Sequence, residues 1–252
     1  MKKLIFIITL FLLFLNCTEA ANVKTVTKDY KIVTNDGFSI NAILEYPKVN
    51  SKKNFETVVL LHSLGYSSEW WEGLPDMLID NGYAVLKIDL RGHGKSIYNA
   101  KLSKTSWKNL TKKAYAKYPD DVISTINYIK NENKRTFFNK WAIIGSDIGA
   151  STAICASNAL SYKPSTIVML SPVINAKGIY IPVKLAELNV DILSITGSND
   201  LNGEKANEYL KRFAQATYAE YHSSSVANGM LMLKNDQSLN KVIVAWINEY
   251  FK

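Results

Sequence analysis

The sequence predicts a single α/β domain, built on a mostly parallel sheet of about eight strands with helices on both faces. From residue 57 to the end of the chain, short continuous apolar runs alternate with helical stretches, as in a parallel sheet covered on both faces. The chain has 252 residues, 47% of them hydrophobic, which suits one domain with a sizeable core. Neither an internal repeat nor a Pro/Gly/Ser-rich linker divides the chain.

The first 20 residues predict a targeting segment, which leaves residues 21–252 as the folded domain. Lys2 and Lys3 precede an apolar run over residues 4–15, which is short for a membrane span and typical of a signal peptide. Residues 14–17, Phe-Leu-Asn-Cys, resemble a relaxed bacterial lipobox, which favours a lipid on Cys17 and a membrane-anchored lipoprotein. The alternative is ordinary cleavage after Ala20, which would give a periplasmic or secreted protein.

The expected elements follow the chain from a hairpin to a closing helix. Strands over 29–34 and 38–46 flank Asn35-Asp36-Gly37, a strong turn signal. The further strands are expected at 57–61, 83–88, 141–144, 166–170, 192–196 and 217–222. The helices are expected at 68–80, 119–129, 148–160, 206–215 and 239–251. Residues 97–118 show no clear pattern.

The formal charge of +8 is spread over many lysines, and no nucleic-acid-binding motif accompanies it. Six lysines between residues 101 and 117 are spaced mostly by three or four, so they could line one helix face near anionic lipid. A solvated helix face is the favoured interpretation. The six are Lys101, Lys104, Lys108, Lys112, Lys113 and Lys117.

Four landmarks in order resemble the α/β-hydrolase superfamily over about residues 35–252. They are His-Ser-Leu-Gly at 62–65, Asp-Leu-Arg-Gly-His-Gly-Lys-Ser at 89–96, Gly-Ser-Asp-Ile-Gly at 145–149 and Ala-Asn-Gly at 227–229. The resemblance is greatest to the lidless dienelactone-hydrolase and serine-aminopeptidase-like branch. It implies the α/β-hydrolase fold without a large cap, since only residues 171–190 separate the sixth and seventh strands.

The third landmark matches the nucleophile elbow, a tight turn from strand to helix. Side chains two residues on either side of the nucleophile would collide, so Gly145 and Gly149 place Asp147 at its apex. Ser146 at the apex would instead put Ile144 and Ile148 at the crowded positions. The resemblance therefore implies that Asp147 replaces the family's serine, and that the backbone N–H groups of Leu64 and Ile148 form the oxyanion hole.

The resemblance also implies the acid and base positions. Asp200 stands where the family keeps its acid, and Asn228 stands where it keeps the catalytic histidine. An amide cannot accept a proton at neutral pH, so Asn228 cannot act as the base. His222 at the end of the last strand would reach Asp147 only after a loop rearrangement, and a partly exposed strand-end position is favoured.

Two functions follow from these positions. The favoured one is a catalytically impaired relative that binds a small molecule in the elbow pocket, without a cofactor or a catalytic metal. In that pocket Asp147, Asp200 and Asn228 would form an oxygen-rich cluster able to hold a hard metal ion or an amine. The alternative is an active hydrolase of small esters or related acyl or alkyl substrates, with Asp147 as nucleophile and His222 or solvent as base.

Overall fold

A computed structural model describes residues 23–50 and 53–251. Within these ranges the central sheet has eight strands in the order β1-β2-β4-β3-β5-β6-β9-β10. Strand β2 is antiparallel to β1 and to β4, and all other neighbouring pairs are parallel. The predicted mostly parallel sheet is thereby confirmed. The strands are β1 (Thr25–Val33), β2 (Ser39–Pro47), β3 (Phe55–Leu61), β4 (Ala84–Ile88), β5 (Thr136–Ser146), β6 (Thr166–Leu170), β9 (Asp191–Gly197) and β10 (Tyr218–Ser223).

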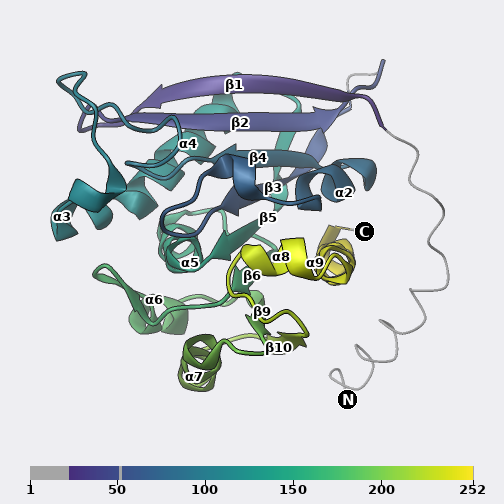
Figure 1. Cartoon of the computed structure of the whole chain (residues 1–252). Helices are drawn as coiled ribbons and strands as arrows, with labels where there is room; N and C mark the ends of the chain where they lie inside the picture. The colour runs from purple at the N-terminus through teal and green to yellow at the C-terminus, as the bar shows by residue number, and fades with distance from the viewer. Residues whose placement is uncertain (1–22, 51–52, 252) are drawn as a thin grey trace.

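Helices cover both faces of the sheet. Figure 1 shows α2, α8 and α9 on one side and α5, α6 and α7 on the other. Strand β3 illustrates the two cores, because Val58 packs with the first group of helices and its neighbour Val59 packs with the second. This is the pattern expected of a strand buried on both faces. The helices are α2 (Leu74–Asp80), α3 (Lys112–Tyr115), α4 (Tyr118–Glu132), α5 (Ile148–Ala159), α6 (Pro182–Ala186), α7 (Leu201–Leu210), α8 (Leu231–Asn235) and α9 (Ser238–Phe251).

The register of the sheet brings five loops to one edge. Leu61 at the end of β3 pairs with Gly145 of β5, and Leu170 of β6 lies between Ser146 and Ile195 of its two neighbours. The loops after β3, β5, β6, β9 and β10 therefore leave the sheet side by side. This is the edge at which ligands bind in open parallel sheets.

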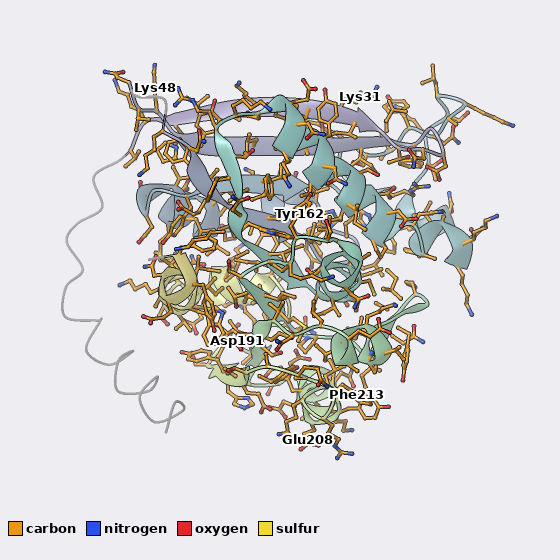
Figure 2. The ribbon with its side chains drawn as sticks, turned by 180° about the vertical axis from the view of Figure 1, so that it is seen from behind. Lys31, Lys48, Tyr162, Asp191, Glu208 and Phe213 are labelled. Atoms are coloured by element: carbon orange, nitrogen blue, oxygen red, sulfur yellow. The ribbon has the colours of Figure 1, made fainter. Side chains whose placement is uncertain are left out.

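Figure 2 shows the molecule from behind, with Lys31 on the outer strand β1 and Glu208 on α7 toward the opposite end of the sheet. Charged side chains such as Lys31 on an outer strand discourage pairing with strands of other molecules.

Three local expectations differ from the structure. The helix expected at 68–80 is a 3₁₀ turn, Ser68–Trp70, followed by α2 from Leu74, because Gly73 has a positive φ of 66° and interrupts it. The helix expected at 206–215 begins at Leu201, where Asp200 caps it. The six lysines between 101 and 117 do not share one helix face, because that segment contains turns, the 3₁₀ turn Trp107–Asn109 and the four-residue α3.

No large cap covers the site, as expected. Between β6 and β9 the chain forms a small hairpin, β7 (Asn175–Ala176) and β8 (Ile179–Tyr180), followed by α6. Within the described residues, no helix is long and apolar enough to cross a membrane. The signal segment 1–20, with Cys17, lies outside the described residues.

Candidate functional site

The elbow between β5 and α5 holds Asp147 in a strained backbone conformation, with φ of 53° and ψ of −116°. A Cβ atom added to Gly149 would lie 2.2 Å from the carbonyl oxygen of Leu61, and one added to Gly145 would lie 2.4 Å from that of Gly149. Both glycines are therefore required by close backbone approach. Ser146 is fully buried, with its Oγ 2.6 Å from Ser63 Oγ.

A cavity of about 340 Å³ opens beside the elbow at the carboxyl edge of the sheet. Asp147, Asp200 and Asn228 all line it, so the structure brings these three predicted residues together. Leu64 lines the same cavity from the loop after β3.

His222 is not brought to this cavity. Its Nδ1 lies 3.1 Å from Thr196 Oγ1 and 3.8 Å from a carboxylate oxygen of Glu204, and its side chain is 60% exposed. The loop rearrangement that would join His222 to Asp147 is not present. The favoured expectation was a partly exposed histidine at the strand end, and the structure places His222 there with a more exposed side chain.

The carboxylate of Asp147 occupies the expected oxyanion hole. Its Oδ2 accepts a hydrogen bond of 3.1 Å from the backbone N–H of Leu64. Burial raises the pKa of Asp147, the N–H groups of Leu64 and Ile148 lower it, the charge of Asp200 raises it, and Lys177 lowers it; the pKa is raised overall. The donors expected to bind an oxyanion thus already hold a side-chain carboxylate of the same chain.

Asp200 has one satisfied and one unsatisfied carboxylate oxygen. Its Oδ1 accepts the backbone N–H of Gly203 at 3.0 Å and caps α7. The residue is 5% exposed, so water does not reach it freely, and its buried Oδ2 has no hydrogen-bond partner among the described residues. This oxygen is one of eight buried side-chain nitrogen and oxygen atoms without a partner among the described residues, and the only one of the eight on a residue that lines the cavity.

His62 and His93 support the loops around the site. The Nδ1–H group of His62 donates to the carbonyl oxygen of Ser63, and its Nε2 accepts the N–H of Leu90. His93 accepts the N–H of Gly65 at Nε2 and donates from Nδ1 to the carbonyl oxygen of Arg91. Both rings are therefore neutral and have both nitrogens engaged. Burial lowers the pKa of both, that of His93 to about 4.

The depressed pKa of His93 predicts a loss of stability in mild acid. Between pH 6.5 and about 4 the unfolded chain binds a proton at His93 that the folded chain does not, so stability falls as the pH falls. We expect the unfolding free energy of the native protein, relative to that of a His93→Gln variant, to fall by about 2 kcal/mol between pH 7.5 and 5. Urea denaturation at the two pH values measures this difference.

The comparison with the variant cancels other titrations. Burial raises the pKa of Asp121 to about 6, so this group makes the protein more stable as the pH falls. Its contribution is the same in both proteins and cancels in the difference. If the difference in unfolding free energy between the native protein and His93→Gln is the same at pH 7.5 and pH 5, His93 does not stay neutral in the folded protein at pH 5.

Comparisons with known proteins agree with this geometry. The sequence model of the family described as serine aminopeptidase, S33, matches residues 52–219, more than half of the chain. The chain belongs to this S33 family. A search of curated proteins found no match.

Solved structures similar to this S33 protein are α/β-hydrolases. An esterase of Pyrococcus furiosus has 17% sequence identity and a TM-score of 0.69, covering 90% of this chain and 94% of that one. A dienelactone hydrolase of Anabaena variabilis has 15% identity and a TM-score of 0.68, covering 90% and 99%. An esterase of Exiguobacterium antarcticum has 13% identity and a TM-score of 0.66, covering 88% and 100%. At these identities the similarity shows the α/β-hydrolase fold alone.

Several further residues of this S33 protein line the cavity and were not predicted, among them Tyr66, Ser171 and Asn202. Ser171 has a positive φ of 50°, and its Oγ accepts the N–H of Gly229 at 2.6 Å, which ties the loops after β6 and β10 together. The position of Ser171 directly after the sixth strand was a usable signal, because residues at the carboxyl ends of parallel strands meet at one edge.

The cavity beside the elbow has few side chains that could bind a metal ion. Asp147 and Asp200 supply two carboxylates, and Asn228 adds an amide. Within the described residues, no three His, Cys, Asp or Glu side chains form a group suited to a metal ion.

Proposed function

We propose that this S33 protein is a catalytically impaired α/β-hydrolase relative that binds a small molecule in the elbow cavity. The observation that carries the proposal is the hydrogen bond from the Leu64 N–H to Asp147 Oδ2. Acyl transfer requires such donors to be available to the oxyanion that develops in the transition state. Here a carboxylate already fills the position, and its charge would repel a second anion.

The absence of a suitable base from the cavity also supports the proposal. Asn228 lines the cavity with an amide, which cannot take a proton from water at neutral pH. His222 is bonded to Thr196 outside the cavity, and no histidine in the described ranges lines it. An ester formed on Asp147 would therefore lack a group to activate water for its release.

Ester hydrolysis by the purified protein tests this function. We expect turnover of p-nitrophenyl acetate and butyrate close to the background reaction, and no change in an Asp147→Ala variant. Turnover in the ordinary enzyme range of about 1–10³ s⁻¹, abolished by Asp147→Ala, would instead establish the active hydrolase with Asp147 as nucleophile.

We also propose that the protein is exported and anchored to the membrane through a lipid on Cys17. The support is the basic start of the chain, the apolar run over residues 4–15 and the lipobox-like residues 14–17. In bacteria fed an alkyne fatty acid, the native protein should carry the label and sediment with membranes. Cys17→Ser should lose both properties, whereas Cys155→Ser should keep them. A native protein that carries no label would favour cleavage after Ala20.

A further inference from the structure

We infer that the elbow cavity binds an organic ammonium ion, namely a primary amine that carries an apolar or aromatic group. This inference rests on the proposed binding function and names its ligand class. It starts from Asp200, which lines the cavity. Its buried Oδ2 forms no hydrogen bond with any described group, while its Oδ1 caps α7. An isolated buried carboxylate oxygen is costly. Oδ2 is covered in this structure, so the proposed ligand binds with a small movement of the Asp200 side chain that uncovers this oxygen, and by donating to it recovers part of that cost.

The missing donor is best supplied by a cation. Asp200 and Asp147 both line the cavity, and the charge of Asp200 raises the pKa of Asp147, so the two carboxylates repel each other. An ammonium group has three N–H donors and a positive charge, and it would form charge-assisted hydrogen bonds at this position. Asn228 also lines the cavity, and its side-chain amide contains an oxygen that can accept a hydrogen bond.

The cation already near Asp147 does not fill this role. Lys177 lowers the pKa of Asp147, but it is exposed on the turn between β7 and β8, with its Nζ 6.0 Å from the ring centre of Tyr115. Lys177 is not among the residues that line the cavity, and it makes no hydrogen bond to Asp200 Oδ2.

The remainder of the cavity wall suits an apolar group. Tyr66, Val173 and Leu231 line it, and Trp70 packs edge-on against Tyr66 with ring centres 5.3 Å apart. Trp70 is 46% exposed, which leaves an aromatic pair accessible beside the cavity. Aromatic faces attract ammonium groups and pack against rings and alkyl chains.

A divalent metal ion fits this wall less well than an amine. Calcium and magnesium take six or more oxygen ligands, whereas this cavity offers two carboxylates beside aromatic and aliphatic side chains. No metal-type cluster occurs in residues 23–50 or 53–251. The cavity volume of about 340 Å³ is within the range of small-molecule sites.

Calorimetry with a charged and a neutral probe of the same shape tests the inference on the unmodified protein. We expect benzylamine at pH 7.5 to bind at least tenfold more tightly than benzyl alcohol, and magnesium chloride not to displace it beyond the effect of sodium chloride at equal ionic strength. Equal binding of the amine and the alcohol, no binding of benzylamine, or specific displacement by magnesium would overturn it.

A variant then locates the site. Asp200→Asn removes the charge and retains the helix cap, since Asn and Asp cap helices about equally well. We expect this variant to bind benzylamine at least tenfold more weakly. The matched control is Asp120→Asn on α4, whose exposed carboxylate pairs with Lys117, and it should keep the native affinity. Native affinity in a folded Asp200→Asn variant would overturn the inference. If that variant does not fold, the amine and alcohol comparison decides.

The two proposals fail in different ways. Rapid ester hydrolysis by the native protein would overturn the proposed function, whatever benzylamine does. Absence of both hydrolysis and benzylamine binding would overturn the amine inference and leave the non-catalytic function standing.

Discussion

The double variant Asp147→Ser/Asn228→His is expected to hydrolyse short acyl esters about 10³-fold faster than the native protein. Serine at position 147 would free the Leu64 N–H group, which now binds the Asp147 carboxylate. Histidine at position 228 would supply a base at the cavity wall. The unpartnered Oδ2 of Asp200 would accept the Nδ1–H of that histidine and orient it.

The single variants control this experiment. Members of a catalytic triad act as a unit, so Asp147→Ser or Asn228→His alone should give a small fraction of the gain. Adding Asp200→Asn to the double variant should remove most of the gain. Initial rates with p-nitrophenyl acetate measure each effect, and circular dichroism verifies the fold. A folded double variant no faster than the native protein would contradict this account of the site.

The second large effect is expected at Arg91, which joins three parts of the fold behind the site. Its guanidinium forms hydrogen bonds of 2.6 and 2.8 Å to Asp121 on α4, and of 2.6 and 2.9 Å to Asp36 in the first hairpin turn. Its carbonyl oxygen accepts from His93, which in turn holds the loop after β3 through Gly65. The Arg91 network therefore supports the loop that carries Leu64.

We expect Arg91→Leu to lower the free energy of unfolding by about 3–5 kcal/mol, because it leaves the carboxylate of Asp121 buried without a cation. Asp121 is 1% exposed, and burial raises its pKa to about 6 even with Arg91 present. A carboxyl group whose pKa is raised in the folded state lowers the stability of the protein as the pH rises. At acidic pH the Asp121 carboxyl is protonated and needs no cation, so the loss of unfolding free energy in Arg91→Leu should be smaller at pH 5 than at pH 7.5. Urea denaturation at pH 7.5 and 5 measures both effects.

Two further variants test the explanation. Asp36→Asn should cost much less, because the Asp36 side chain is 43% exposed and water can replace its contacts. Replacing both members in Arg91→Leu/Asp121→Leu should recover part of the loss, since no buried charge is left unpaired. A loss below about 1 kcal/mol in Arg91→Leu would show that the buried pair does not control stability.

Much of the fold could be predicted from the sequence because it depends on local periodicity. The apolar run 57–61 indicates a strand buried on both faces wherever it pairs, and Val58 and Val59 do pack on opposite faces. The boundaries were less predictable because side-chain caps and turn geometry decide them. Helix α7 begins five residues before the expected start because Asp200 caps it, and Gly73 divides the helix expected at 68–80.

The sequence by itself determined that Asp147 stands at the apex of the elbow, because Gly145 and Gly149 admit a close backbone approach there. The order of the four landmarks also led to the prediction that Asn228 stands where the family keeps its histidine, and the structure places Asn228 at the cavity. The direction of each side chain was decided by the tertiary structure. The Asp147 carboxylate turns to the Leu64 N–H, and His222 turns to Thr196, and in both contacts the partner comes from a segment distant in the sequence. Such contacts exist only once the sheet has assembled and its loops meet at one edge.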